Sequence, residues 1–390
     1  MSDSADKEMQ EEESLNIFSI QYLSAIYSSL IATMRSRNSL IIMTLLSSAL
    51  VMLWLAYIPL PNLHVVMISA SDATHRTLHR LAPSTIHKDS LRELDIDKQY
   101  LNQLGFVGTP NMFGVSPINS SFPPPVFVSA IYWKNVQYTR EFISSLQQYL
   151  PERRVVIYDL GLSYYDKKEF SASCNITMGC IFRSFDYSKY PYHIQSMETR
   201  AYLPVILQQA LNDFGGIIWV DTSKEAKYLI TGDLKEILKK AQKVGLVGWT
   251  VDEPTSALSH PKMFSYFKTK QDHYYFHRMI STETLVLFNT KMLHYDVMEP
   301  WVRCALIEEC VRPTGAKNTA CNYNRKPLYR YSGCHRYEMS AMNIILGLVF
   351  NFDCGEYTTK IPILSSVAPN STDVTSAAQV TTKAQHVTRM

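Results

Sequence analysis

The sequence predicts an α/β domain with a mostly parallel sheet flanked by helices, preceded by one transmembrane helix and a stem. Three features predict this arrangement. Patterns typical of strands and of helices alternate between residues 126 and 363. Residues 217–220 form a short run that is wholly apolar, β-branched and aromatic, which suits a strand buried on both faces. Residues 39–60 form a run of 22 residues without a charged side chain.

The composition indicates a globular chain of ordinary type. Its 390 residues are 46% hydrophobic and 19% charged, with a formal net charge of +3. This length is sufficient for a sizeable core, and nothing in the composition indicates collagen-like repetition. The small positive charge comes without a dense basic stripe, so we expect no nucleic acid as a partner.

The uncharged run 39–60 predicts a signal anchor in the lipid bilayer. At about 1.5 Å per residue it would extend roughly 33 Å, enough to cross a hydrocarbon core of about 30 Å. Arg35 and Arg37 precede the run, whereas residues 61–73 after it contain no Lys or Arg. This asymmetry places the polar tail 1–38 in the cytoplasm and predicts a single-pass type II membrane protein.

Cysteines and glycosylation sequons support that orientation, because all of them follow the run. The sequons begin at Asn119, Asn175 and Asn370. Both features fit the oxidising lumen of the endoplasmic reticulum or Golgi. The seven cysteines are Cys174, Cys180, Cys304, Cys310, Cys321, Cys334 and Cys354.

The spacing of the cysteines suggests three short closed loops. Cys174 could pair with Cys180, and Cys321 with Cys334. Cys304 and Cys310 could pair only if the helix between them ends, because six residues of helix separate Cα atoms by about 9 Å. An odd number of cysteines leaves at least one thiol free or paired between chains.

The luminal part is expected to begin with a stem and to end with a disordered tail. Residues 61–125 are rich in Ser, Thr and Pro, and the Pro run near 125 marks the domain boundary. One short helix is expected within 89–104. Residues 364–390 are rich in Ser, Thr, Val and Ala and are not expected to fold.

Within the domain 126–363, hydrophobic periodicity separates strands from helices. The expected strands are 126–131, 154–158, 181–185, 217–220, 244–249 and 284–288. The expected helices are 139–149, 197–214, 234–243 and 336–349.

Carboxylates follow several of these strands. Asp221 comes directly after the buried strand, Asp159 ends the second strand, and Asp252 and Glu253 follow the strand 244–249. In open α/β sheets, ligands bind beyond the carboxyl ends of the strands, so these residues are candidates for chemistry. Each of them could instead cap a turn or lie in a solvated loop.

Two segments carry a resemblance to a known class of enzyme. Arg200-Ala-Tyr-Leu-Pro204, followed by Ile217-Ile-Trp-Val-Asp221-Thr-Ser223, resembles the region up to the Asp-x-Asp motif of GT-A glycosyltransferases, especially those of family 8. Glu338-Met-Ser-Ala-Met-Asn343 is similar to a degraded form of their Asp-Gln-Asp-x-x-Asn motif. The stretch 301–338 resembles more closely a poorly characterised animal family, expanded in nematodes, with the same single-pass layout.

The resemblance implies transfer of a sugar from a nucleotide-sugar donor to a glycan or glycoprotein acceptor in the secretory pathway. It implies that Arg200 and Asp221 contact the donor, and that Glu338 serves the acceptor side. Asp252 and Glu253 are further candidates for the general base of the acceptor hydroxyl. Residues that could also bind the donor are Asp159, Ser223 and Arg336.

A Mn²⁺ or Mg²⁺ ion is also implied by the resemblance, with Asp221 as a ligand. Ser223 occupies the second acidic position, however, and a neutral hydroxyl is a poorer ligand for a hard dication. His335 could supply the missing ligand. Alternatively, Arg200 and Arg336 could neutralise the diphosphate, since arginine binds phosphate without a metal.

The same departures favour an alternative function. Ser223 replaces an acid, and Met339 and Ser340 replace Gln and Asp of the family motif. A GT-A-like domain that has lost catalysis would serve as a membrane-tethered binding or chaperone protein. An adhesion ectodomain would fit the span and the sequons, but would leave the strand–helix alternation unexplained.

Overall fold

A computed structural model describes the chain in several ranges. They are 47–49, 94, 96–107, 122–175, 179–223, 227–230 and 234–367. Clustering of contacts separates residues 1–63, of which only the helical residues 47–49 are described, from residues 64–390. Within the described ranges, no helix combines the length and the apolar character that a membrane span requires. The predicted tail 1–38 lies outside these ranges, as does most of the predicted span 39–60.

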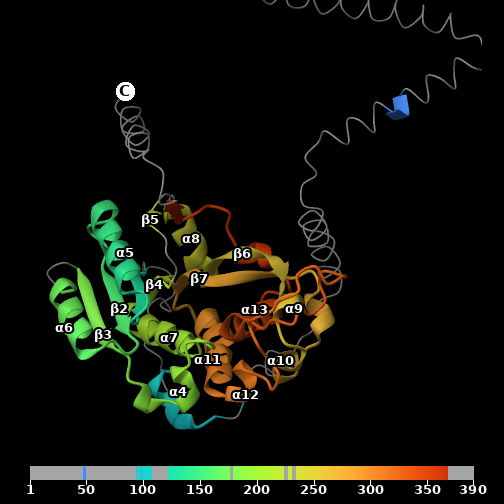
Figure 1. Ribbon diagram of the computed structural model, residues 1–390, viewed down its shortest axis with the longest axis horizontal. Coiled ribbons are helices and arrows are strands. Elements are labelled where there is room, and N and C mark those ends of the chain that lie inside the picture. Colours follow the sequence, from blue (N-terminus) through green and yellow to red (C-terminus); the bar gives the residue numbers. More distant parts are fainter. Residues whose placement is uncertain are drawn as a thin grey trace, which may run out of the picture. The chain divides into compact units, whose positions relative to one another are not determined.

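The domain is built on a six-stranded sheet (Figure 1). Strands β3, β2, β1 and β4 are parallel, whereas β7 runs antiparallel to both of its neighbours, β4 and β6. The predicted mostly parallel sheet is therefore confirmed. In spatial order the strands are β3 (Cys180–Ser184), β2 (Val155–Asp159), β1 (Val126–Ile131), β4 (Gly216–Val220), β7 (Arg278–Phe288) and β6 (Leu246–Pro254).

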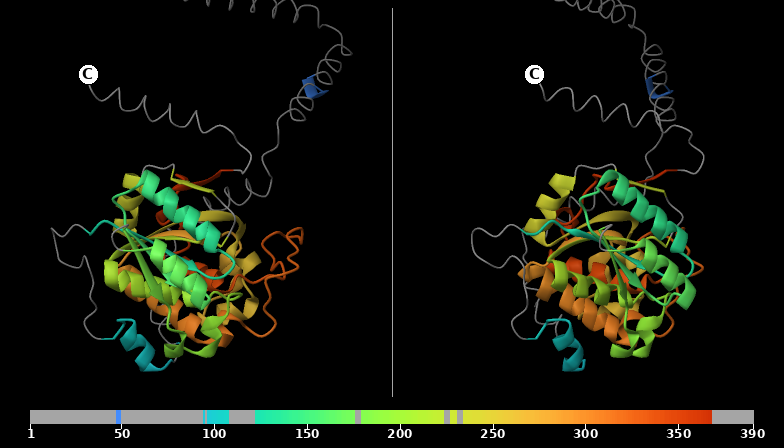
Figure 2. Two further views of the ribbon diagram at one scale, coloured as in Figure 1. Left: turned by 60° about the vertical axis from the view of Figure 1, so that its left-hand side comes forward. Right: turned by 90° about the vertical axis from the view of Figure 1, so that its left-hand side faces the viewer.

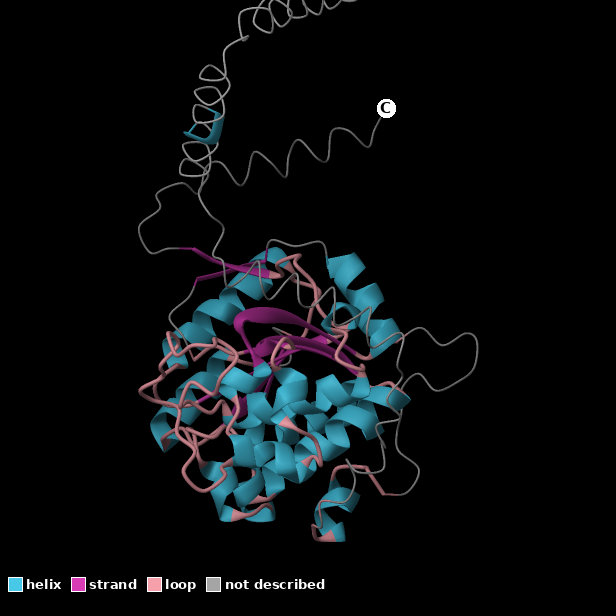
Figure 3. Ribbon diagram, turned by 90° about the vertical axis from the view of Figure 1, so that its right-hand side faces the viewer, coloured by secondary structure: helices cyan, strands magenta, loops and turns pink. Residues whose placement is uncertain are grey.

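Helices cover both faces of this sheet. Alternate side chains of the central strand β4 point to opposite faces, so Trp219 joins one core cluster and Val220 the other. The first cluster contains residues of α7, α11 and α13, and the second contains residues of α5 and α8. Figures 2 and 3 show the sheet between these two helical layers. Complete burial of each large side chain contributes about 1.5–3 kcal/mol to the stability of the fold.

The helices include the four that the sequence predicts and several that it does not. Helices α5, α8 and α13 agree with expectation to within three residues, whereas α6 and α9 to α12 were not predicted. The α-helices are α4 (Lys98–Gln103), α5 (Val136–Tyr149), α6 (Tyr164–Ser173), α7 (Tyr202–Phe214), α8 (Leu234–Val244), α9 (Thr255–Leu258), α10 (Pro261–Tyr266), α11 (Glu299–Leu306), α12 (Glu308–Val311) and α13 (Tyr337–Val349).

Two boundaries differ from expectation in ways that shape the site. Helix α7 begins at Tyr202 rather than at residue 197, and Arg200 just before it has a left-handed backbone with φ +51°. Strands β6 and β7 are longer than predicted because they pair along most of their length, with register shifts around Thr250. Asp252 and Glu253 therefore lie within β6 instead of in a loop after it.

The segment before the domain is partly built into it. The predicted short helix is present as α4, and Leu101, Leu104 and Phe106 are buried in the first core cluster. Asn212 of α7 donates a hydrogen bond to the carbonyl oxygen of Leu104 at 2.9 Å, and Arg303 of α11 donates one to that of Leu94 at 2.8 Å. This part of the predicted stem thus packs against the domain.

At the other end, the ordered chain continues beyond the predicted boundary at Ile363. Strand β8 (Leu364–Val367) pairs antiparallel with β5 (Lys227–Ile230) in a second, two-stranded sheet. The first four residues of the predicted tail are therefore ordered by strand pairing. Residues 368–390 lie outside the described ranges.

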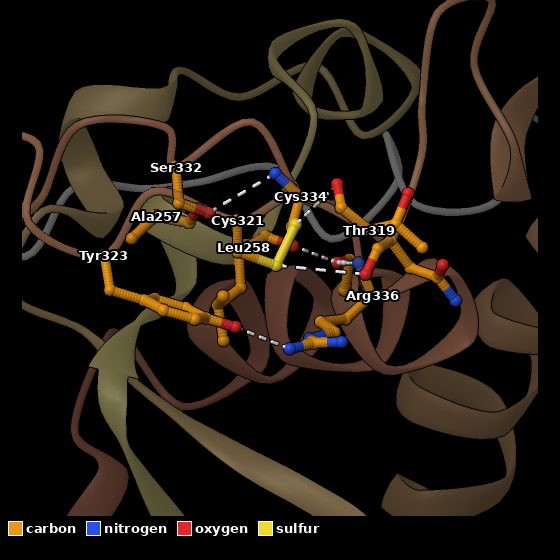
Figure 4. The surroundings of a disulfide bond; sticks show 10 residues. Ala257, Leu258, Thr319, Cys321, Tyr323, Ser332, Cys334 and Arg336 are labelled. Carbon is orange, nitrogen blue, oxygen red and sulfur yellow. Dashed lines mark hydrogen bonds between the residues drawn. A yellow bond between two sulfur atoms is a disulfide. The ribbon is translucent and has the colours of Figure 1, made fainter.

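All three suggested disulfides are present. Cys174 is bonded to Cys180, Cys304 to Cys310, and Cys321 to Cys334 (Figure 4). The second bond is possible because α11 ends at Leu306 and the backbone turns extended at Ile307. The seventh cysteine, Cys354, is buried and is not part of a disulfide.

Candidate functional site

The site is organised around Asp221, which emerges directly after β4 at the carboxyl edge of the parallel strands. Its backbone N–H donates to the carbonyl oxygen of Glu283 at 2.8 Å. One carboxylate oxygen, Oδ1, accepts a hydrogen bond from the N–H of Ser223 at 2.8 Å. The other, Oδ2, lies 3.0 Å from Nη2 of Arg200. The carboxylate is thus held by its own turn and by one arginine.

Arg200 joins two carboxylates that are far apart in the sequence. Its Nη2 contacts Asp221, and its Nε lies 3.7 Å from Oε1 of Glu338. Burial alone would lower the pKa of the guanidinium, but the charges of the two carboxylates outweigh it and raise the pKa above its ordinary value. Arg200 is therefore a permanent cation. A ligand can reach it, because 23% of its side chain is exposed.

Glu338 lies at the second position of α13 and is 4% exposed. Its Oε1 accepts a hydrogen bond from the hydroxyl of Thr282 at 3.0 Å, and its carbonyl oxygen accepts one from Trp301 at 2.9 Å. Burial raises the pKa of Glu338 to about 7, with Arg200 opposing the rise. A carboxyl group with this pKa can both accept and return a proton at neutral pH.

Two hollows meet at Arg200. The smaller has a volume of about 90 Å³ and lies at the ends of β1, β2 and β4; its walls include Tyr132, Asn135, Leu160, Tyr202, Asp221 and Ser223. The larger has a volume of about 340 Å³; its walls include Glu198, Glu253, Glu283, Arg336 and Glu338. Arg200 contributes to both. One cation therefore stands between a hollow that carries Asp221 and a hollow that carries Glu338.

A buried network of hydroxyl groups fixes the loop that follows β4. Thr222 is completely buried, and its Oγ1 lies 2.8 Å from the hydroxyl of Thr139, 3.2 Å from that of Ser129 and 3.1 Å from Nδ2 of Asn135. Asn135 in turn accepts a hydrogen bond from the N–H of Tyr132 at 2.7 Å. The network ties the ends of β1 and β4 to the start of α5, which holds Asp221 in place.

The predicted donor residues are divided between the two hollows. Ser223 lies in the smaller hollow beside Asp221, whereas Arg336 lies in the larger one and donates to the hydroxyl of Tyr323 at 2.7 Å (Figure 4). Asp159 has a structural role: it accepts hydrogen bonds from the N–H groups of Gly161 and Leu162 and pairs with Lys167 at 3.0 Å. The neighbour of Asp159, Leu160, lines the smaller hollow instead.

The two carboxylates of β6 have different surroundings because consecutive residues of a strand face opposite sides. Glu253 lines the larger hollow. Asp252 is 75% exposed, lies in the wall of neither hollow, and is 3.8 Å from Nη2 of Arg278. Of this pair, only Glu253 is placed to contact a ligand in the larger hollow.

His335 does not have the surroundings of a metal ligand. Its side chain is completely buried, its Nδ1 accepts a hydrogen bond from the N–H of His260 at 3.0 Å, and its Nε2 donates to the carbonyl oxygen of Val311 at 3.1 Å. Burial lowers the pKa of His335 to about 3, so the ring is neutral. Both nitrogens are occupied in fixing the loop before α13, and this removes the support for His335 as a ligand.

Among the described residues, no three His, Cys, Asp or Glu side chains gather into a group that could hold a metal ion. The oxygens of Asp221 already accept from Ser223 and Arg200, and the neutral Ser223 stands where a second acid is expected. These residues do not fit a Mn²⁺ or Mg²⁺ ion, which prefers several oxygen ligands with negative charge among them.

Several site residues were missed by the sequence analysis. Tyr132 and Tyr202 line the smaller hollow, and Thr282 and Glu198 line the larger one. Burial raises the pKa of the Tyr132 hydroxyl, and the charge of Asp221 adds to the effect. Tyr132 carried a signal because it directly follows a predicted strand, and Tyr202 carried one because it is the aromatic residue of the motif Arg200-Ala-Tyr-Leu-Pro204. Thr282 reaches the site through antiparallel pairing, which the pattern of one strand does not predict.

A family profile matches part of the chain. Residues 93–208 match the profile of a family described as a protein of unknown function (DUF1647). No curated protein matches the chain.

The solved structures that resemble the chain include several glycosyltransferases. The apo WbbM bifunctional glycosyltransferase is 12% identical, with 60% of this chain and 38% of that chain covered and a TM-score of 0.32. The galactosyltransferase LgtC, in complex with donor and acceptor sugar analogues, is 15% identical, with coverages of 57% and 70% and a TM-score of 0.30. Core-mannan synthase A from Aspergillus fumigatus, in its Mn/GDP form, is 9% identical, with coverages of 67% and 83% and a TM-score of 0.34.

The chain spans well under half of the length of WbbM. At these TM-scores the alignments do not establish a common fold. The functional argument therefore depends on the site.

Proposed function

We propose that this protein is a glycosyltransferase that moves a sugar from a nucleotide-sugar donor to a hydroxyl group of a glycan or glycoprotein. The observation that supports this proposal is the position of Arg200, which contacts Asp221 and Glu338 where two hollows meet. A transferase needs a cation for the leaving diphosphate and a base for the acceptor, close to each other.

The donor occupies the smaller hollow and extends toward Arg200. This hollow lies at the carboxyl ends of three parallel strands, the usual place for a nucleotide in an α/β sheet. Its volume of about 90 Å³ accommodates only a part of the donor, namely the base or the ribose, between Tyr132 and Tyr202. Asp221 and Ser223 supply hydrogen-bonding groups for the ribose hydroxyls.

The acceptor occupies the larger hollow, beside Glu338. The oxygen of the acceptor hydroxyl forms a bond to the anomeric carbon of the donor sugar, and the carboxylate of Glu338 takes the proton of that hydroxyl. The bond from that carbon to the diphosphate breaks, and its electron pair stays on the diphosphate oxygen near Arg200. The pKa of about 7 lets Glu338 accept this proton at neutral pH.

We further propose that the protein is a type II membrane protein of the endoplasmic reticulum or Golgi, with the domain in the lumen. Three disulfides support an oxidising compartment. Asn175, the sequon residue between Cys174 and Cys180, is exposed as a glycan acceptor must be. The bilayer anchor remains a prediction for residues 39–60.

A specific observation also favours the second candidate, a catalytically inactive binding or chaperone protein. The carboxylate of Asp221 is already neutralised by Arg200, and Ser223, Met339 and Ser340 depart from the motifs of the enzyme class. On this alternative, the same hollows would bind a partner without turnover.

Release of nucleotide from donor sugars separates the two candidates. The full-length chain is incubated with UDP-sugars and GDP-mannose, and the free UDP or GDP is measured with and without a mixture of glycan acceptors. We expect turnover that Asp221→Asn abolishes and that the surface change Glu169→Gln leaves intact. Absence of turnover with all donors, from a protein that is folded by circular dichroism, would contradict the enzyme and leave the binding protein.

A further inference from the structure

The surroundings of Asp221 differ from those of a metal site in a way that has a chemical consequence. GT-A glycosyltransferases, which the sequence resembles, neutralise the donor diphosphate with a divalent cation. In this protein the donor set does not fit such an ion: Ser223 is neutral, and its N–H donates to Oδ1 of Asp221. The other oxygen of Asp221 faces a guanidinium nitrogen of Arg200 at 3.0 Å, where a dication would need that oxygen for itself.

We propose that the guanidinium of Arg200 takes the place of the metal and binds the donor diphosphate directly, so that the protein acts without a divalent cation. This inference rests on the proposed function, because it assumes a nucleotide diphosphate in the site.

The structure holds Arg200 as a fixed cation. Asp221 at the end of β4 and Glu338 at the start of α13 grip it from two separate elements. Its backbone has φ +51°, a conformation that side-chain-bearing residues adopt rarely and at an energetic cost. Such strain persists only where the surroundings impose it, and the side chain of Arg200 pairs with both carboxylates from this backbone.

Arg200 also has the capacity for another anion. A guanidinium carries five N–H donors in one plane, and two of them can bind two phosphate oxygens in parallel. The side chain lines both hollows and is partly exposed, so phosphate can reach it without displacement of Asp221. Arg336 in the larger hollow is a second cation that can share the charge.

The test is calorimetric binding of UDP and GDP to the full-length chain, once with EDTA and once with MnCl₂. We expect the affinity for the preferred nucleotide to be the same in both to within about twofold, because no step of binding uses the metal. Arg200→Gln should weaken binding roughly 10- to 100-fold, the range for loss of a charge-assisted hydrogen bond. Addition of Mn²⁺ should not restore it.

Matched variants separate charge from folding. Arg140→Gln removes an arginine that pairs with Glu169 on the surface, away from both hollows, and should bind nucleotide like the wild type. Arg200→Lys keeps the charge but loses the planar fork, and should lie between the wild type and Arg200→Gln. The EDTA comparison on the wild type does not depend on the folding of any variant.

Each outcome decides something different. Nucleotide binding that EDTA abolishes and Mn²⁺ restores would overturn the role of Arg200 while leaving the proposed transferase standing. If Arg200→Gln binds the nucleotide with the same affinity as the wild type, the proposed role of Arg200 is also wrong. If the wild type binds neither nucleotide in either buffer, the proposed function fails and this inference fails with it.

Discussion

The two hollows on either side of Arg200 are built in different ways. The smaller one is formed by the ends of β1, β2 and β4, which are adjacent parallel strands, and by the buried hydroxyl network around Thr222. The larger one is formed by the antiparallel strands β6 and β7, the start of α13 and residues that flank the loop closed by the Cys321–Cys334 disulfide.

The smaller hollow has a construction common to α/β proteins, whereas the larger one is specific to the tertiary structure of this protein. Polar residues at the carboxyl ends of strands are common in α/β sheets, and nucleotides often bind there. The larger hollow depends on contacts between segments that are distant in the sequence, such as Thr282 with Glu338. We therefore expect the smaller hollow to determine donor binding and the larger one to determine the acceptor.

The largest expected effect concerns catalysis in the larger hollow. Glu338→Gln removes the base, and loss of general base catalysis typically lowers the rate by about 10²- to 10⁴-fold. Binding of UDP or GDP in the smaller hollow should change little by comparison. Steady-state transfer assays and calorimetry on the same preparations measure the two effects. Equal losses in both would contradict the division of roles.

The same substitution should increase stability at high pH. The folded-state pKa of Glu338, about 7, lies above its ordinary value of 4.5. The contribution of Glu338 to stability is therefore fully present below pH 4.5 and falls by about 3 kcal/mol between pH 4.5 and about 7, because ionisation of the buried group is costly. Gln cannot ionise and avoids this loss.

Urea unfolding at pH about 5.5 and about 8.5 measures the difference. We expect Glu338→Gln to be more stable than the wild type by up to about 3 kcal/mol at the higher pH, and by much less at the lower pH. A pH-independent difference between the two proteins would show that Glu338 has an ordinary pKa.

Removal of the disulfide near the larger hollow should change the free energy of unfolding by a similar amount. Replacement of Cys321 and Cys334 by Ser opens a loop of about 14 residues, and should cost about 3 kcal/mol by loop entropy. Asn318 and Arg336 of the hollow's wall lie just outside the two ends of this loop. We expect acceptor transfer to fall while nucleotide binding is preserved. The matched control is replacement of Cys174 at the end of α6 and Cys180 at the start of β3, which line neither hollow.

A smaller effect is expected from the hydroxyl network of the other hollow. Thr222→Val keeps the shape of the side chain but leaves the partners of its hydroxyl, including Thr139 and Asn135, short of a buried hydrogen bond, at a cost of about 1–3 kcal/mol. Nucleotide binding should weaken because Asp221 loses its support. Thermal unfolding and calorimetry check both effects, with the exposed change Ser144→Ala as control. Unchanged nucleotide affinity would show that the network does not position Asp221.

The smallest expected effects come from the two neighbouring carboxylates of β6. Glu253→Gln alters the wall of the larger hollow and should change the KM for the acceptor several-fold. Asp252→Asn affects only an exposed pair with Arg278, worth about 0–1 kcal/mol, and should leave transfer unchanged. The reverse result would place the acceptor on the other face of β6.

The sequence predicts the fold well where periodicity is local. Residues 126–131 read as a strand and form β1, and the predicted buried strand 217–220 is β4 at the centre of the sheet. The length of β6 and β7 was underestimated because antiparallel pairing with a neighbour, rather than composition, extends them. Helix α7 starts later than predicted because the backbone of Arg200, two residues before Tyr202, is left-handed and interrupts the helical conformation.

Part of the site was also predictable from local sequence patterns. Asp221 is visible as a polar residue at the end of an apolar run, and Arg200 and Glu338 were found by resemblance to family motifs. Their convergence is a property of the tertiary structure. His335 and Asp159 carry suitable side chains for ligand binding, but their hydrogen bonds to backbone groups engage them in the fold, which a sequence does not reveal.

The central claim is that Arg200 holds the donor diphosphate between the two hollows. A structure of the full-length chain with UDP or GDP, determined in the presence of MnCl₂, tests it most directly. We predict a phosphate oxygen within hydrogen-bonding distance of the Arg200 guanidinium, with the base or ribose between Tyr132 and Tyr202 and no manganese on Asp221. A nucleotide bound outside both hollows, or a manganese ion between Asp221 and the phosphates, would contradict it.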